Sequence, residues 1–167
     1  MKIIHQHTFQ TTLDRVIAML ADEDFAAVRA NASGAAAQDV LVDGEPTSAF
    51  TVLIRRTVPS SSIPAELRSF IGKELKVKYT EAWEPPHPQE VDRVGTFAME
   101  IAGAPGHVAG AIGLTPGDGT VNFIATGEIS VSVPLIGAII ERAISQTMEQ
   151  GFVAELAAAD KWLAERA

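Results

Sequence analysis

The chain has 167 residues, of which 47% are hydrophobic and 20% charged, and its formal net charge at pH 7 is -8. This composition predicts a folded protein, most simply one domain over residues 1–167, and excludes a disordered chain. The negative charge argues against nucleic acid as a partner, and the absence of Cys excludes disulfides and thiolate metal sites.

The first predicted elements are a strand and two short helices. Residues 2–9 mix β-branched, aromatic and polar types, which favours a strand, and they lack the apolar core of a secretory signal. Apolar residues then recur at helical spacing over 11–22. A second helix, roughly 22–30, begins at the acidic pair Asp22 and Glu23, which suits a helix start.

About six strands follow, with one helical interruption. They span 37–44, 47–58, 74–84, 92–103, 106–116 and 119–133, and turns rich in Gly, Pro and Asp separate them. A short helix over 62–72 interrupts the run, with Pro64 at its first position and Gly72 at its end. Because successive strands joined by short turns pair antiparallel, we expect one antiparallel sheet with one face to bury.

The chain closes with a helix-like segment about 30 residues long, which is the only element large enough to cover that face. Pro134 can end the last strand and open this helix. The apolar run VPLIGAII (133–140) is too short to span a bilayer, so we expect a cytoplasmic protein without stable membrane insertion. One stripe of the helical wheel is predicted to face the sheet; it comprises Ile136, Ile140, Ala143, Thr147, Gly151, Ala154 and Ala158.

This stripe changes from large to small side chains along the helix. Because protein interiors contain few voids, the small residues mean either that the helix backbone approaches the sheet closely or that a gap is left for a ligand. Gly151 in mid-helix costs roughly 1 kcal/mol relative to Ala, so a packing or functional reason is expected. A further apolar stripe is covered either by the N-terminal elements or by a homodimer contact through this helix; it comprises Phe152, Leu156, Ala159 and Leu163.

The order of elements resembles the α+β helix-grip fold of the START/SRPBCC superfamily. The segments that carry the resemblance are HQHTFQTTLDRVIAMLADEDF (5–25) and VPLIGAIIERAI (133–144), and they are similar to the domain-of-unknown-function family numbered 2505. The resemblance implies a curved antiparallel sheet of about 6–7 strands around a long C-terminal helix, with two short helices after the first strand. It also implies an apolar cavity for lipids, sterols or polyketides, but fold alone does not fix function.

Strand alternation and the helical wheel select the residues that we predict to line this cavity. They are Phe50, Val52, Arg56, Tyr79, Glu81, Trp83, Phe97, Met99, Phe123, Ile140, Ala143, Thr147 and Gly151. Glu81 is unusual, because a buried carboxylate must find a partner or take up a proton. Either Glu81 and Trp83 lie in water at a strand end, or Glu81 orients a ligand or acts as an acid or base, with Arg55 or Arg56 as its partner.

No metal or cofactor motif is visible. His5 and His7 share a face of the first strand, but no carboxylate or third His lies at a supporting spacing. No phosphate-binding loop or nucleophile elbow is present. The sequence therefore favours a non-enzymatic carrier or sensor of a small hydrophobic molecule. A cyclase- or aromatase-like enzyme, with Glu81 or a His as acid or base, and an interaction protein with a filled core are the alternatives.

Overall fold

The computed structural model describes residues 1–59, 61, 63, 65–69 and 73–167. Over this part of the chain the elements are, in order, β1 (Lys2–Phe9), α1 (Leu13–Leu20), α2 (Glu23–Ala32), β2 (Ala37–Gly44), β3 (Phe50–Pro59), α3 (Ala65–Arg68), β4 (Glu74–Trp83), β5 (Arg93–Ile101), β6 (Gly106–Pro116), β7 (Val121–Val131) and α4 (Gly137–Glu165). The predicted order of strands and helices is confirmed.

The seven strands form one antiparallel sheet in the order β1-β7-β6-β5-β4-β3-β2. From β2 to β7 each strand pairs with the next along the chain, as short turns favour. The first strand, β1, instead pairs with the last, so that Phe9 lies opposite Val121. The sheet is therefore open, with β1 and β2 as its edges, and α1 and α2 form the connection between these edges.

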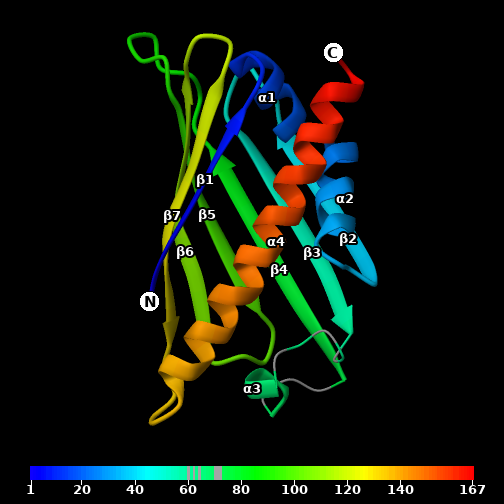
Figure 1. The fold of residues 1–167 in the computed structure, drawn as a ribbon, viewed down its shortest axis with the longest axis vertical. Coiled ribbons are helices and arrows are strands. Elements are labelled where there is room, and N and C mark those ends of the chain that lie inside the picture. The colour runs from blue at the N-terminus through cyan, green and yellow to red at the C-terminus, as the bar shows by residue number, and fades with distance from the viewer. Residues whose placement is uncertain (60, 62, 64, 70–72) are drawn as a thin grey trace.

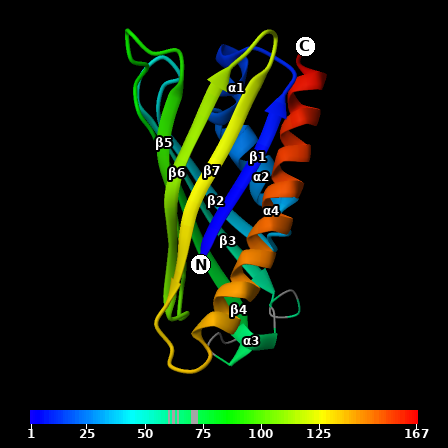
Figure 2. The ribbon, with the colours of Figure 1, turned by 60° about the vertical axis from the view of Figure 1, so that its left-hand side comes forward.

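The long helix α4 lies diagonally across one face of the curved sheet (Figures 1 and 2). It runs from the end of the molecule where α3 lies to the end where α1 lies, and it packs against α1, α2, β1 and β7. Its 29 residues agree with the predicted length, but it begins at Gly137, after Pro134 rather than at it. The intervening Leu135 has a φ of 72°, so this segment forms a turn between β7 and α4.

The buried face of α4 differs from the predicted stripe. It comprises Ile140, Ala143, Ile144, Met148, Phe152, Ala159 and Leu163. Ile140 and Ala143 are buried as predicted, whereas Thr147 is exposed and Gly151 is half-buried, so these two residues lie at the edge of the buried face and not at its centre. Because α4 crosses a curved sheet diagonally, the side of the helix that faces the interior shifts along its length. A helical wheel assumes that the same side of the helix is buried along its whole length, so it cannot predict this change.

The second apolar stripe of α4 is covered by the chain itself. Phe152, Ala159 and Leu163 are at most 8% exposed. The ring of Phe152 stacks on His5 of β1 at a centroid distance of 4.5 Å. At the far end, Arg15 of α1 donates a hydrogen bond to the carbonyl oxygen of Leu163 at 2.8 Å. Leu156 is half-buried and, with Ala159, lies near Met19 and Leu20 of α1 and Phe25 of α2, so the N-terminal strand and helices cover this stripe.

The helices α1 and α2 begin close to where the sequence predicts. The side chain of Asp22 accepts hydrogen bonds from the backbone amides at the start of α2. The predicted interruption of the strands appears as α3, although Pro64 and Gly72, its expected first and last residues, lie outside the described residues. Within the described residues, no helix has the length and apolar character that crossing a bilayer requires.

Candidate functional site

A cavity of about 390 Å³, called here the main cavity, lies between the sheet and α4. Apolar side chains from β3, β4, β5 and α4 form most of its lining; they are Val58, Leu75, Val77, Met99, Ile101, Ile144, Met148 and Phe152. Three of the lining residues, Gly34, Thr147 and Gln150, are exposed. They mark the mouth of the cavity, which lies between the segment after α2 and the outer side of α4.

Gly151 lies in the part of α4 that borders the main cavity. A Cβ atom built on Gly151 would meet nothing within 4 Å. Close approach of the helix backbone to the sheet therefore does not explain this glycine. Of the two explanations that the sequence left open, the gap is the one that the structure shows at this position.

Glu81 of β4 lies in a buried polar cluster on the inner face of the sheet. Its Oε1 atom accepts hydrogen bonds from Arg29 Nη2 at 2.6 Å and from the Tyr79 hydroxyl at 2.7 Å, and its Oε2 accepts from Trp83 Nε1 at 3.0 Å. Tyr79 and Trp83 reach Glu81 because residues two apart on a strand point to the same face. Glu81 and Trp83 are each 2% exposed, so the alternative that they lie in water is wrong.

A second carboxylate, Glu155 of α4, extends this cluster toward the main cavity. Its Oε2 accepts from Arg29 Nε at 3.2 Å, and its Oε1 accepts from Arg56 Nη1 at 3.1 Å. Arg56 Nη1 also donates to the hydroxyl of Ser33. Arg56, Glu155, Arg29 and Glu81 thus alternate in charge and join β3, α4, α2 and β4. We call these four residues the polar network.

Opposing effects set the protonation of this network. Burial alone would raise the pKa of Glu81, but the charge of Arg29 and the hydrogen bonds from Arg29, Tyr79 and Trp83 outweigh it and hold that pKa below its usual value. Burial alone would lower the pKa of Arg29, but the charges of Glu81 and Glu155 raise it well above its ordinary value. Burial and the charge of Glu81 also raise the pKa of Tyr79. At neutral pH, Glu81 is therefore an ionised acceptor and Tyr79 a neutral donor.

The structure brings together five of the residues predicted to bind a ligand. Those that line the main cavity are Arg56, Tyr79, Met99, Thr147 and Gly151. Glu81 and Phe123 instead line a smaller cavity of about 20 Å³, and Ile140 lines a separate void of about 10 Å³. The other predicted residues are buried away from the lining of the main cavity; they are Phe50, Val52, Trp83, Phe97 and Ala143.

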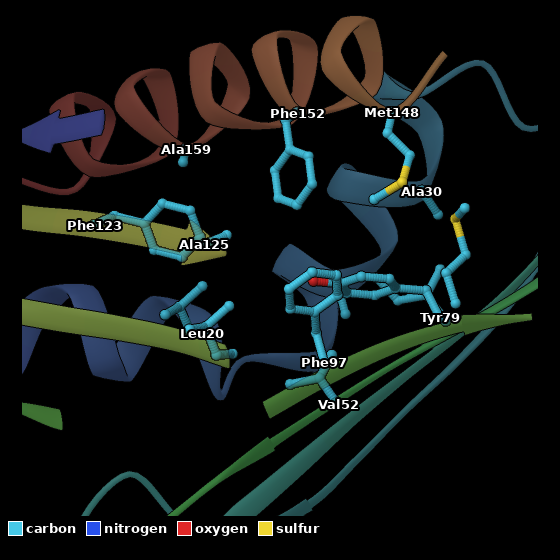
Figure 3. Packing of buried hydrophobic residues seen from close by; sticks show 14 of the residues in the cluster. Leu20, Ala30, Val52, Tyr79, Phe97, Phe123, Ala125, Met148, Phe152 and Ala159 are labelled. Atoms are coloured by element: carbon cyan, nitrogen blue, oxygen red, sulfur yellow. The ribbon is translucent and has the colours of Figure 1, made fainter. Parts of the chain in front are cut away.

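Phe152 separates the main cavity from the smaller one, and it lines both. Its side chain points from α4 toward Phe97 of β5 (Figure 3), with the ring centroids 6.5 Å apart. On the far side of Phe152 the interior is filled by side chains that include Phe9 and Phe25. The main cavity therefore occupies only the part of the interior near the middle of α4, from Ile144 to Glu155.

Sequence reasoning missed Arg29, Phe152 and Glu155 as parts of this region. Arg29 and Glu155 lie on two different helices, so no spacing in the sequence connects them. One signal was available: Glu155 follows Phe152 by three residues, which places a carboxylate on the same side of α4 as a buried aromatic ring.

Comparison with solved structures defines the class of fold. The Zhui aromatase/cyclase from Streptomyces sp. R1128 is 15% identical, with a TM-score of 0.65 over 99% of this chain and 94% of that chain. Norcoclaurine synthase from Thalictrum flavum, in complex with dopamine and hydroxybenzaldehyde, is 15% identical, with a TM-score of 0.62 over 100% of this chain and 88% of that chain. A protein from Thermus thermophilus is 11% identical, with a TM-score of 0.64 over 100% and 99% of the two chains. These similarities show the helix-grip SRPBCC fold.

The match to a family model is more specific. The chain belongs to the family described as "Protein of unknown function (DUF2505)", whose model matches residues 4–163. The resemblance expected from the sequence is therefore confirmed for both the fold and the family. No curated protein matches the chain.

Proposed function

We propose that this protein is a cytoplasmic carrier or sensor that binds a small hydrophobic molecule, such as a lipid or a polyketide, in the main cavity. The supporting observation is the cavity itself, with its volume of about 390 Å³ and its largely apolar lining. Sites for small molecules typically measure about 300–1,000 Å³ and combine such a lining with a few polar groups. Burial of apolar ligand surface, at about 25 cal/mol per Å², would drive binding.

A cyclase- or aromatase-like enzyme that uses the same cavity is the second candidate. The similarity to an aromatase/cyclase and to a norcoclaurine synthase that holds dopamine and hydroxybenzaldehyde favours it. However, Glu81, the acid or base of that hypothesis, already accepts three hydrogen bonds. Among the described residues that line the main cavity there is no His to replace it. We therefore consider a binding function better supported than an enzymatic one.

An interaction protein with a filled core is less well supported, because the main cavity leaves part of the interior unfilled. A homodimer through α4 stays a prediction. The apolar side chains that this helix offers to a partner are Ile139, which is 48% exposed, and Val153, which is 64% exposed.

A pair of tryptophan variants on α4 tests the carrier proposal. Gly151→Trp places a large side chain in the open space beside the main cavity, whereas Val153→Trp places the same side chain on the exposed side of the helix. We expect the wild-type protein and Val153→Trp to bind the neutral apolar dye Nile red, with increased fluorescence, and Gly151→Trp to lose this binding while keeping its circular dichroism spectrum. Native mass spectrometry of freshly purified wild-type protein should also reveal a bound apolar molecule. Equal dye binding by both variants would contradict the proposal.

A further inference from the structure

The polar network at the edge of the main cavity carries no net charge. It contains two guanidinium groups, Arg29 and Arg56, and two carboxylates, Glu81 and Glu155, with ion-pair distances between 2.6 and 3.2 Å. The side chains are 6% and 13% exposed for the two arginines, and 3% and 12% exposed for the two glutamates. Because so little water reaches these groups, an additional ion beside them would be poorly screened.

The hydrogen bonds of this network leave donors unused. Each of the four carboxylate oxygens of Glu81 and Glu155 accepts at least one hydrogen bond. In contrast, Nη1 of Arg29 is buried and has no hydrogen-bond partner among the described residues, although Arg29 lines the smaller cavity and not the main one. Arg56, which lines the main cavity, donates through Nη1 alone in the hydrogen bonds found within the described part of the chain. A guanidinium group has five N–H donors, so Arg56 has donors left that it can offer to a ligand in the main cavity.

From this balance we infer that the ligand carries an uncharged hydrogen-bond acceptor, such as a ketone, ester or ether oxygen, which faces Arg56. This inference rests on the proposed function, because it concerns the ligand of the same cavity. A ligand carboxylate at Arg56 would lie near the carboxylate of Glu155, 3.1 Å from Arg56 Nη1, and would add an unbalanced negative charge. A ligand ammonium would be repelled by Arg56 and would add an unbalanced positive charge to the neutral network.

Three ligands of equal carbon number provide the test: methyl octyl ketone, decanoate and decylamine. Each is titrated at about pH 7 against wild-type protein that holds Nile red, and the concentration that displaces the dye is measured. We expect the ketone to displace Nile red at a concentration about tenfold or more below that of either ion, because the ions add an uncompensated buried charge. Stronger displacement by decanoate or by decylamine would overturn the inference while leaving the carrier proposal intact.

Variants that change the charge of the network make the test more specific. Glu155→Gln gives the network a net positive charge, so decanoate should gain about tenfold relative to the ketone. Glu165→Gln makes the same change on α4 at a side chain that is 56% exposed, and it should keep the wild-type order of ligands. If Glu155→Gln does not fold, Arg56→Gln replaces it and should favour decylamine. An unchanged order in the folded network variant would overturn the inference, and failure of the wild-type protein to bind Nile red or any of the three ligands would overturn the carrier proposal as well.

Discussion

Arg29 of α2 forms ion pairs with both the sheet and α4. Its guanidinium group contacts Glu81 at 2.6 Å and Glu155 at 3.2 Å, with only 6% of its side chain exposed. The variant Arg29→Met leaves Glu81 buried without its counter-charge, so we expect the free energy of unfolding in urea to fall by about 3–5 kcal/mol. Arg55→Met is the control, because Arg55 and Asp39 form an ion pair whose side chains are 56% and 73% exposed. Arg55→Met should lower the free energy of unfolding by less than about 1 kcal/mol. Equal losses in the two variants would show that the buried ion pairs contribute no more than an exposed one.

His5 gives the stability of the protein a dependence on pH. Burial lowers the pKa of His5 below 6.5, and the negative charge of Glu149 raises it by a smaller amount. Between the lowered pKa of the folded state and the ordinary value, the unfolded chain binds a proton that the folded protein does not. The contribution of His5 to stability is therefore complete above about pH 6.5 and declines as the pH falls toward the pKa of the folded state.

The His5 prediction can be checked by NMR. The imidazole signals of His5 should titrate with a midpoint below 6.5, and Glu149→Gln should move that midpoint further down, because it removes the charge that favours protonation. A midpoint at or above 6.5, or an upward shift in the variant, would be inconsistent with the burial of His5 against Phe152.

At the scale of the element, α4 contains a glycine that its packing does not require. Because a Cβ on Gly151 would enter open space, Gly151→Ala should stabilise the protein by about 0.5–1 kcal/mol through the higher helix propensity of Ala. Gly110→Ala is the contrasting variant, because a Cβ at this position of β6 would collide with the backbone of Thr126 and Gly127. It should lower the free energy of unfolding by about 1–3 kcal/mol. Thermal unfolding of the two variants distinguishes these outcomes, and destabilisation by Gly151→Ala would mean that no gap exists there.

The strands were more predictable than the helix that covers them. Alternation along β4 placed Tyr79, Glu81 and Trp83 on the inner face correctly, because a strand has a fixed period of two residues. The wheel for α4 placed Thr147 and Gly151 at the centre of the inner face, but in the structure they lie at its edge and Met148 and Phe152 are buried, because the curved sheet changes the direction in which the helix faces the interior. Local periodicity therefore predicts which face of a strand is inward, whereas the orientation of a long helix depends on contacts that are distant in the sequence.

For the whole molecule, the sequence predicted the order of the elements and the layer in which the cavity lies, but not how the buried charges pair. The sequence left open whether Glu81 lies in water or is buried with a partner, and Arg55 and Arg56 were considered for the role of partner. The partner is Arg29 of α2, 52 residues away in the sequence. Its selection depends on how α2 docks between the sheet and α4, and no pattern in a single sequence encodes that docking.

The position of the mouth of the main cavity indicates the route by which a ligand would enter and leave. The exposed residues Gly34, Thr147 and Gln150 belong to a loop and to a helix, so among the described residues the opening is not framed by paired strand edges. If the protein carries a ligand as proposed, the ligand would enter between the segment after α2 and α4, and the pairing of the seven strands would not have to change. On that route the ligand would pass the ion pairs of Glu155 with Arg29 and Arg56, which connect α4 to α2 and to β3.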